Sequence, residues 1–584
     1  MKKNKIFNIV TISILILSII LGIVIPTKNV FNTIFKTIAL VDSVVMTVYA
    51  LAKEDKIYKI VSIIVLLSLI MGYIIPGTTV QYGAVEKGTI NPVTFVDLFT
   101  NLIYSANVFV PAFTYVLVIG AFYTILNKTG KYDSLVNNVA VTFNKNKGLF
   151  VVLTIFALGL VTFFTGEFYT LLIFVPFLIS VVKKLGYKSE TAVLTTVGSI
   201  LLGNAGSMYT YYTNQILSLT VKDNVLTKVI VLLTALVLLV AFILVFCEKP
   251  NTTKELKKET GKKLAPLHIA MWLIFILLIL GFVNWEGYFG FKGFDKFLET
   301  LRKGQIAKIS IFDLIVGKTI VSFGTWQLFN ASVLFLFVGL IIGLIYKLKF
   351  DDLMESVKEG FKKAFPYAMI VVLAILVLVN VAYSGTFYTM IVDITSKKVN
   401  LLTSTVVGVL TSIFSADSVN AAQFAVYSAS LTKASGYQNL LAITYQAVYS
   451  LFLLISPTSI LLLLGLKYTG IKYRDWIKYI YKFFIVLFIT LLVVINFTVN
   501  IKFGLSDKTT VIIGIISLVL LVVAFVILFW YKLIKTAVKH GTIEANKVLK
   551  ETKKEEVKEE NKKTPAKKSS TKKNTTNKNS KKKK

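Results

Sequence analysis

Residues 148–184 read GLFVVLTIFALGLVTFFTGEFYTLLIFVPFLISVVKK. Two apolar runs are joined by a short polar tip at 164–167, and lysines flank the stretch at 147 and at 183–184. Lysine and arginine collect on the cytoplasmic side of a membrane, so both ends should lie there. The stretch therefore predicts a re-entrant helical hairpin, whose polar tip must line a cavity or be buried in protein.

The composition of the whole chain indicates a membrane protein. Of its 584 residues, 55% are hydrophobic and 16% are charged, with a mean hydropathy of +0.74, which is too apolar for a soluble domain. The strong apolar runs, each near the ~20 residues that cross a bilayer, lie at 7–25, 57–75, 108–126, 226–247, 267–284, 331–347, 367–391, 480–498 and 509–530. We therefore expect an all-α polytopic membrane protein.

The sequence argues against an enzyme or a metalloprotein. Cys247 is the single cysteine, and His268 and His540 are the two histidines, so no Cys/His ligand set has a useful spacing. Gly317-Lys318-Thr319 resembles the end of a phosphate-binding loop, but Phe312 stands where that motif needs its first glycine. We expect no cofactor, with H+ or Na+ as the candidate coupling ions.

Basic residues predict the orientation of the chain. They collect at 53–59, 128–147, 183–188, 249–263, 347–363 and 467–482, so these segments should be cytoplasmic, and loops 76–107 and 285–330 external. This places a multi-pass protein in the cell membrane with both termini in the cytoplasm. Residues 561–584 hold eleven lysines and no acidic residue. The tail is expected to be a disordered, solvated extension, with contact to anionic lipid, or to nucleic acid, as the alternatives.

Two internal repeats run through the sequence. A local repeat relates residues 5–26 to residues 56–76, since a serine, a glycine and a final Ile-Pro recur 50 residues apart. A global repeat pairs residues 95–98, 111 and 129–130 with residues 255 further on, and residues 164–167 and 186–187 with residues 250 further on. The first copy begins in an external loop and the second in a cytoplasmic loop. The repeats are therefore expected to be inverted, as in many secondary transporters.

These repeats divide the chain into six parts. We expect extra N-terminal transmembrane segments at 1–56, a first transport repeat with its preceding helix at 57–225, connecting helices with an external loop at 226–349, a second inverted repeat at 350–479, C-terminal transmembrane helices at 480–544, and the Lys-rich cytoplasmic tail at 545–584.

Four interruptions of apolar segments should converge on one site. The second copy has its own hairpin, 402–416 and 418–431, and each hairpin precedes a helix broken near its middle, at 203–207 and at 456–459. Non-helical backbone at membrane depth is tolerated only in a polar cavity or inside protein. The candidate substrate- or ion-binding residues are Thr165, Gly166, Glu167, Asn204, Gly206, Ser207, Ser415, Asp417, Ser418, Ser456, Thr458 and Ser459.

Glu167 and Asp417 occupy equivalent positions in the two tips. A carboxylate inside a bilayer costs ~3 kcal/mol and is rare without a function. We expect no Lys or Arg in the neighbouring apolar segments, so these groups would take a proton or bind a cation, which favours a cationic substrate. The aromatic residues at 209, 211 and 212, with Asn214 and Gln215, suit cation–π contact, or else an interfacial aromatic cluster.

Several motifs resemble a known family. They are residues 72–77 (GYIIPG), 91–99 with 126–130, 185–187, 203–207, and Pro457-Thr458-Ser459 followed by Gly470-Ile471-x-Tyr473-x-x-Trp476. Together they resemble the YfcC-type carriers, relatives of the anaerobic dicarboxylate carriers within the ion-transporter superfamily. The resemblance implies two hairpins and two broken helices around a central site, frequent homodimers, and in some members exchange of basic amino acids such as arginine and ornithine.

These observations predict a secondary active transporter of an organic solute that works by alternating access. A basic amino acid is the preferred substrate, and a dicarboxylate or other carboxylate is the alternative. A non-transporting scaffold or receptor, with the lysine tail recruiting a partner, is the alternative of another class.

Overall fold

The computed structural model describes residues 2–27, 29–81, 84–208, 224–247, 250–251, 259, 264–306, 309–395, 400–415 and 435–503. It also describes residues 511–512, 514–520, 522–523 and 526. The chain divides into two units, 1–518 and 519–584, and the described residues of the second unit are helical. The elements named below belong to the first unit.

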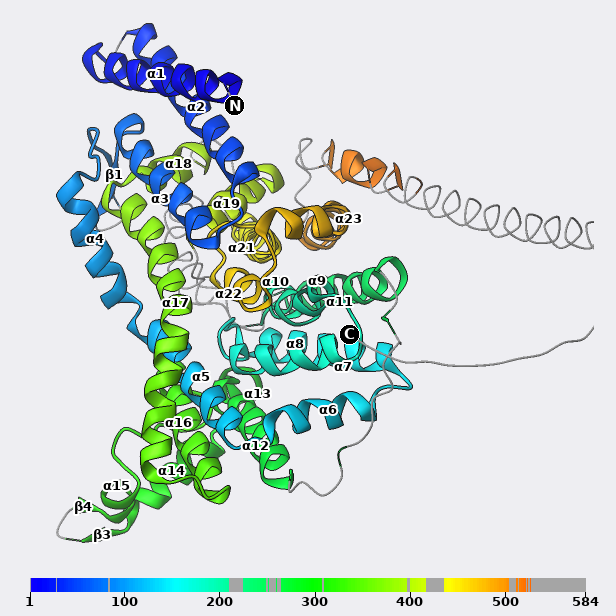
Figure 1. Ribbon diagram of the computed structural model, residues 1–584. Helices are drawn as coiled ribbons and strands as arrows, with labels where there is room; N and C mark the ends of the chain where they lie inside the picture. Colours follow the sequence, from blue (N-terminus) through cyan, green and yellow to red (C-terminus); the bar gives the residue numbers. More distant parts are fainter. Residues whose placement is uncertain are drawn as a thin grey trace, which may run out of the picture. The chain divides into compact units, whose positions relative to one another are not determined.

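Helices make up most of the first unit (Figure 1). The first half contains α1 (Lys2–Val24), α2 (Val30–Lys53), α3 (Ile57–Ile74), the strands β1 (Thr78–Gln81) and β2 (Ala84–Lys87), α4 (Phe95–Val108), α5 (Val110–Lys128), α6 (Tyr132–Thr142), α7 (Lys147–Thr165), η1 (Leu172–Phe174), α8 (Val175–Lys184), α9 (Ser189–Val193), the π-helical η2 (Leu194–Gly198), α10 (Ser199–Ala205), α11 (Val225–Ala241) and the π-helical η4 (Phe242–Phe246).

The second half contains α12 (Ala265–Phe282), α13 (Trp285–Phe289), α14 (Gly293–Lys303), the strands β3 (Gln305–Ile306) and β4 (Ile309–Ser310), α15 (Ile311–Ile315), α16 (Leu328–Ile345), α17 (Phe350–Tyr383), α18 (Thr386–Thr395), α19 (Leu401–Phe414), α21 (Ser435–Phe452), α22 (Ile460–Thr469) and α23 (Tyr473–Phe503). The strands form two small antiparallel hairpins, in which Thr78 pairs with Lys87 and Gln305 pairs with Ser310.

Nine of the described helices are long and apolar enough to cross a membrane. They lie at Val30–Lys53, Ile57–Ile74, Val110–Lys128, Lys147–Thr165, Val225–Phe246, Ala265–Phe282, Leu328–Ile345, Phe350–Tyr383 and Tyr473–Val499. The chain is thus a polytopic, helical membrane protein, as its composition predicts.

Local sequence explains where several helices begin and end. Proline stands in the first turn of α5, α8 and α12, where its missing N–H would have no partner within the helix. Helices α1 and α3 each end two residues before a proline, at Pro26 and Pro76, since the residue before proline avoids the helical conformation. The two copies of the local repeat therefore end their helices at the same place.

The global repeat is visible in the order of the elements. Helices α4 and α5, α6 and α7 of the first copy correspond to α17, α18 and α19 of the second. Gly130 follows α5 with φ of 65°, and Gly385 follows α17 with φ of 67°, so both copies end the helix in the same left-handed conformation. The next matched pair differs in its backbone: Gly186 has φ of 95°, whereas Gly436 lies in the first turn of α21.

Helices α4 and α5 of the first copy run antiparallel to α17, their counterpart in the second copy. Asn101 near the start of the first copy donates to Asn380 at the end of α17, at 3.1 Å. At the other end, the Lys128 ammonium lies 3.7 Å from a carboxylate oxygen of Asp352. Figure 1 shows α5 and α17 side by side. Antiparallel counterparts agree with the inverted arrangement that the basic residues predict.

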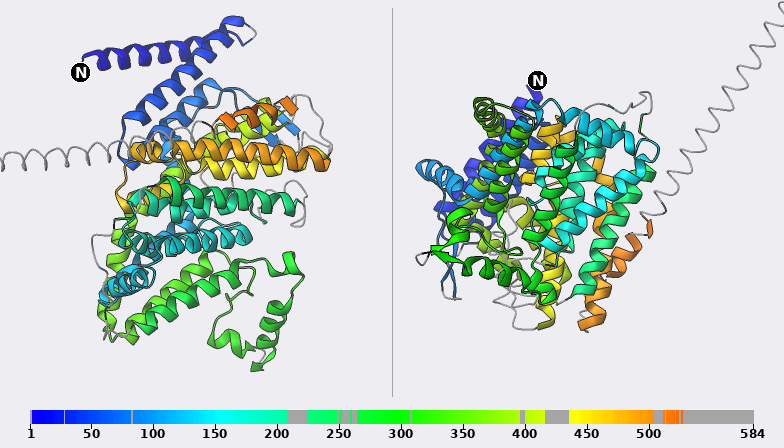
Figure 2. Two further views of the ribbon diagram at one scale, coloured as in Figure 1. Left: turned by 90° about the vertical axis from the view of Figure 1, so that its right-hand side faces the viewer. Right: turned by 90° about the horizontal axis from the view of Figure 1, so that it is seen from below.

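Helix α23 joins the N-terminal helices to the second half. The Lys472 ammonium donates to Asp55, between α2 and α3, at 2.8 Å, and this bond is the main reason that the pKa of Asp55 lies below its ordinary value. Further along, the buried Trp476 indole donates to the Leu454 carbonyl at 2.8 Å. Figure 2 shows α23, in gold, along the yellow α21. Helix α23 therefore supports the segment that follows α21.

Candidate functional site

The first helix break follows α10. The helix ends at Ala205, and Gly206 packs so closely on α11 that an added Cβ would lie 2.3 Å from the Lys228 carbonyl oxygen. The Ser207 hydroxyl and the Met208 N–H both donate to the Phe163 carbonyl, at 3.0 and 2.8 Å. The end of α10 is thus bonded to α7, the helix that precedes the first predicted tip.

The second break lies between α21, which ends at Phe452, and α22, which begins at Ile460. The Thr458 hydroxyl donates to the Ile413 carbonyl at 2.8 Å, and the Ser456 hydroxyl donates to the Ser412 carbonyl at 2.6 Å. Buried Ser459 begins α22 without a side-chain cap bond. In sequence, Ile413 is the counterpart of Phe163, so a hydroxyl fastens each break to the matching helix of its own copy.

Side chains of α21 join the first break to the second half of the chain. The Gln446 amide donates to the carbonyls of Asn204 and Ser207, both at 2.9 Å, and the Asn204 amide donates to the Ser450 hydroxyl at 2.7 Å. All four residues are buried. Among the described residues, the side-chain oxygens of Asn204 and Gln446 have no hydrogen-bond partner. The junction therefore holds two buried carbonyl oxygens that can accept a bond or coordinate a cation.

Tyr449 of α21 contacts residues beside both predicted hairpin tips. Its hydroxyl donates to the Ser415 carbonyl at 3.1 Å, and its ring lies 6.3 Å from that of Phe168 beside the first tip. Thr165 is buried, Glu167 is half-buried, and Gly166 ends α7 with φ of 70°, a conformation that glycine adopts without strain. Tyr449 and the Gln446–Asn204 bond lie one helical turn apart on α21, so the tips and the first break form one buried region.

The structure does not describe every predicted site residue. Asp417 and Ser418 lie outside the described residues, as do the tyrosines at 209, 211 and 212 with Asn214 and Gln215. The described candidates are Thr165, Gly166, Glu167, Asn204, Gly206, Ser207, Ser415, Ser456, Thr458 and Ser459.

One expectation about charge was wrong. We predicted that the neighbouring apolar segments hold no Lys or Arg, yet Lys228 of α11 is 3% exposed and its ammonium donates to the Met208 carbonyl at 3.1 Å. The sequence gives no sign that Lys228 is buried, because a lysine near the end of an apolar span ordinarily extends its side chain to the membrane interface. A cation thus stands beside the first break, and the argument for a cationic substrate loses its premise.

Sequence patterns also missed Gln446 and Ser450. Together with Tyr449 they occupy positions i, i+3 and i+4 of α21, which lie on one face of a helix. Polar residues with this spacing in an apolar run were the signal that could have identified them.

Two contacts hold the first tip from other elements. The Tyr115 hydroxyl of α5 donates to the Thr170 carbonyl at 2.9 Å, and the Tyr288 hydroxyl of α13 donates to the Phe164 carbonyl at 2.8 Å. The tip therefore lies against both α5 and the loop between α12 and α16.

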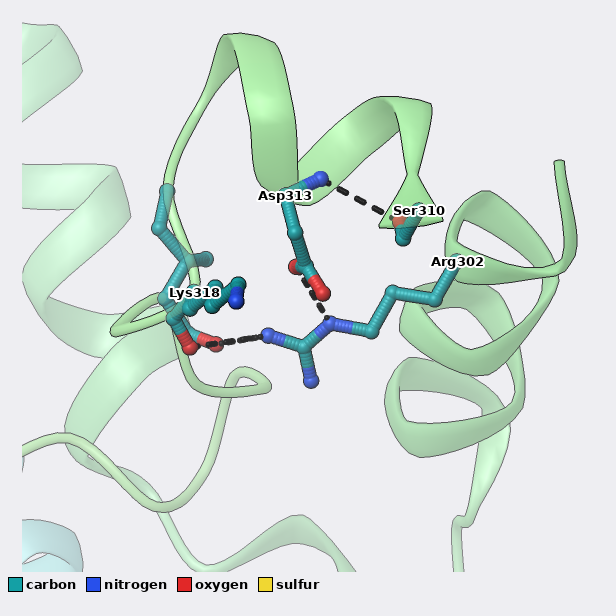
Figure 3. Close-up of polar contacts among 5 residues, drawn as sticks. Arg302, Ser310, Asp313 and Lys318 are labelled. Carbon is teal, nitrogen blue, oxygen red and sulfur yellow. Dashed lines mark hydrogen bonds and ion pairs between the residues drawn. The ribbon is translucent and has the colours of Figure 1, made fainter. Parts of the chain in front are cut away.

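That loop also contains the sequence that resembles a phosphate-binding loop. The Arg302 side chain donates to Asp313 at 2.9 Å and to the Lys318 carbonyl at 3.2 Å (Figure 3). The Asp313 N–H in turn donates to the Ser310 hydroxyl at 3.2 Å. The Arg302 guanidinium thus holds the segment around Lys318 in place, because the carbonyl groups of Lys318 and Ile320 accept its hydrogen bonds.

The chain is similar to known membrane carriers in sequence and in structure. The sequence model of one family, described as DcuC: C4-dicarboxylate anaerobic carrier, matches residues 5–500. No curated protein matches the chain. Among solved structures the chain is similar to the YdaH transporter of Alcanivorax borkumensis, with 13% identity and a TM-score of 0.37 over 77% of this chain and 98% of that one. The family match includes both breaks and both tips.

Proposed function

The chain belongs to the C4-dicarboxylate anaerobic carrier family, and from this premise we propose that it is a secondary carrier that moves a C4-dicarboxylate by alternating access. It is a transporter and not an enzyme. The observation that carries the proposal is the buried junction in which Gln446 of the second copy binds two carbonyls at the break of the first. A site shared by two inverted copies can open to either side when one copy moves against the other.

Helix termini at the junction suit an anionic substrate. Helix α22 begins directly after the second break, and its first N–H groups have no side-chain cap. Such N–H groups and the positive end of the helix dipole favour carboxylates. In this proposal Ser207, Ser456 and Thr458 hold the backbone of the breaks, while α22 and the region around Asn204 receive the substrate.

The proposed coupling ion is Na+. The unpartnered side-chain oxygens of Asn204 and Gln446 are neutral, so they do not take up a proton at ordinary pH, but they are the oxygen ligands that hard cations use. Exchanging Na+ for K+ should then stop accumulation, whereas a proton-coupled carrier would respond to the pH gradient instead.

A basic amino acid is the second candidate substrate. Glu167 at the first tip is the observation in its favour, because a half-buried carboxylate can bind an ammonium or guanidinium group. In this reading Glu167→Gln abolishes transport, whereas a dicarboxylate carrier tolerates the change.

Uptake by proteoliposomes distinguishes the two substrates. Purified carrier should accumulate labelled succinate under an inward Na+ gradient and exchange it for internal fumarate. Vesicles loaded with ornithine are challenged with labelled arginine in parallel. Arginine uptake without succinate uptake would overturn the proposed substrate, and no uptake of either by folded protein would overturn both and favour the scaffold.

We also propose that the carrier resides in the cell membrane with both termini in the cytoplasm, because the basic segments lie on that side in the predicted orientation. Labelling of single cysteines placed at residues 55 and 290 should mark opposite faces, and labelling of both from one side would contradict the orientation.

A further inference from the structure

Five exposed apolar residues lie on the segment between α12 and α16. Phe297 of α14 is 60% exposed, and Leu314 and Ile315 of α15 are 69% and 76% exposed. Leu301 and Val316 are exposed as well, and these five residues are called the loop patch below. Such residues are ordinary on a membrane-spanning helix, but α14 and α15 have 11 and 5 residues and are too short to cross a bilayer. The loop patch therefore needs a contact surface of another kind.

Hydrogen bonds hold this segment close to the membrane-spanning helices. The N–H groups of Gly324 and Trp326 both donate to the Gly281 carbonyl near the end of α12, at 2.9 and 3.0 Å. Gly281 also packs closely on the Trp326 ring, since an added Cβ would lie 2.3 Å from it. The Tyr288 hydroxyl donates to the Phe164 carbonyl of α7, at 2.8 Å. Because α7 and α12 are both long and apolar enough to span a membrane, the segment is held where the chain leaves the bilayer.

Helices α14 and α15 form one unit within the segment. The Arg302 side chain of α14 donates to Asp313 of α15 at 2.9 Å (Figure 3). The same guanidinium donates to the Ile320 carbonyl at 2.9 Å, beyond the end of α15. The two helices are therefore fixed to each other, and their exposed residues can contact the same surface.

Helix α14 has the pattern of a helix that lies in the surface of a membrane. Phe297 and Leu301 are four residues apart and share one face of the helix. Lys296 and Lys303 are exposed on its polar side. A helix with phenylalanine and leucine on one face and lysines on the other places its apolar face among the acyl chains and its ammonium groups among the headgroups.

The lysines favour lipid over a second protein as the occupant. The segment 285–330 contains five lysines and one arginine against four acidic residues, although a loop with this predicted external position ordinarily has few basic residues. Protein interfaces are depleted of lysine. The phosphate groups of a bilayer, in contrast, attract lysines near its surface.

We propose that the loop patch inserts into the boundary between the headgroups and the acyl chains of the bilayer. The segment between α12 and α16 is then a membrane-surface anchor and not a loop surrounded by water. Insertion removes its exposed apolar area from water, which is the main driving force for such binding. The inference goes beyond the proposed function and does not depend on which solute is carried.

Nitroxide labels on single cysteines test the depth of the loop patch in the full chain, reconstituted in phospholipid nanodiscs. The background is Cys247→Ser, and the labelled variants are Phe297→Cys and Ile315→Cys. Glu299→Cys is the matched control, because Glu299 is exposed on the polar side of α14. Electron paramagnetic resonance measures the collisions of each label with oxygen, which concentrates in the bilayer, and with a nickel complex that stays in water.

The ratio of oxygen to nickel collisions should be several-fold higher at residues 297 and 315 than at residue 299. Equal ratios at all three positions would mean that the loop patch faces water, and the inference would be wrong. Protection of residues 297 and 315 from both reagents would also overturn it, because protein would then cover the patch; dipolar coupling between labels of two carriers would identify a second copy.

The labels replace exposed side chains, so the carrier should fold normally, and size-exclusion profiles check this. If Phe297→Cys does not fold, Leu314→Cys takes its place, since Leu314 is also exposed. The measurement needs no transport activity. A carrier that takes up no succinate therefore leaves this inference intact, and a water-exposed loop patch leaves the proposed function intact.

Discussion

Replacing Gln446 with methionine tests whether the two halves of the chain must be joined for transport. Methionine has a similar length and shape but cannot donate a hydrogen bond. The change removes both 2.9 Å bonds and leaves the carbonyls of Asn204 and Ser207 without this donor in a buried region. The Asn204–Ser450 bond and the Ser207–Phe163 bond do not involve Gln446 and should remain.

The magnitude follows from the two lost bonds. The Asn204 carbonyl still accepts from the Ser207 N–H, at 3.0 Å, so the loss is that of two hydrogen bonds. A hydrogen bond contributes about 0.5–1.5 kcal/mol, so the junction should be destabilised by about 1–3 kcal/mol. Even the lower value corresponds to about fivefold in an equilibrium constant. If transport requires the closed junction, the uptake rate should fall by at least this factor.

The assay is initial succinate uptake in proteoliposomes with equal amounts of inserted carrier. Gln305→Met is the matched control for the substitution itself, because Gln305 of strand β3 is exposed. Size-exclusion profiles in detergent show whether Gln446→Met remains folded. A folded Gln446→Met carrier with uptake within about twofold of wild type would refute the argument that this junction forms the transport site.

Three further predictions concern packing, support of the second break and pH. Gly360→Ala places a Cβ 2.4 Å from a backbone atom of α5 and should cost about 1–3 kcal/mol in a thermal unfolding assay, whereas Gly304→Ala meets only an ordinary contact and should not change stability. Trp476→Phe removes the donor to the Leu454 carbonyl and should lower both the unfolding temperature and uptake; an unchanged uptake rate would separate this contact from the site. The folded-state pKa of Asp55 is lowered, mainly by its bond to Lys472, so the stabilisation is fully present above the ordinary aspartate pKa. The stability advantage over Asp55→Asn should therefore shrink once the pH falls below that ordinary value, and should be lost as the pH falls through the lowered pKa.

Much of the fold could be predicted because membrane helices are specified by long apolar runs. The repeat was equally readable, since Gly130 and Gly385 keep the same left-handed conformation. One shared residue behaves differently in the two copies: Pro111 lies in the first turn of α5 after a break, whereas its counterpart Pro366 lies inside the continuous α17. The fixed φ of proline permits both outcomes, and packing decides between them.

The site was less predictable because tertiary contacts define it. Helix breaks at 203–207 and 456–459 could be located from glycine, proline and hydroxyl residues in apolar segments. The partners that join them could not, since Gln446 is about 240 residues from Asn204 in the sequence. Lys228 was misjudged for a related reason: periodicity places a residue on a helix face, but it does not say which neighbouring backbone that face meets.

Some contacts at the site occur in both copies of the repeat, and others occur in only one copy. Each copy bonds the residues after a helix end to its own preceding helix, through Ser207 to Phe163 and through Thr458 to Ile413. Gln446 has no such equivalent, because the residue 250 positions earlier, Thr196, donates only within its own helix. These shared contacts hold matching backbone segments of the two copies against matching helices. Selectivity for an asymmetric substrate pose must then come from the residues that only one copy has, and these are the residues whose substitution should change what is carried.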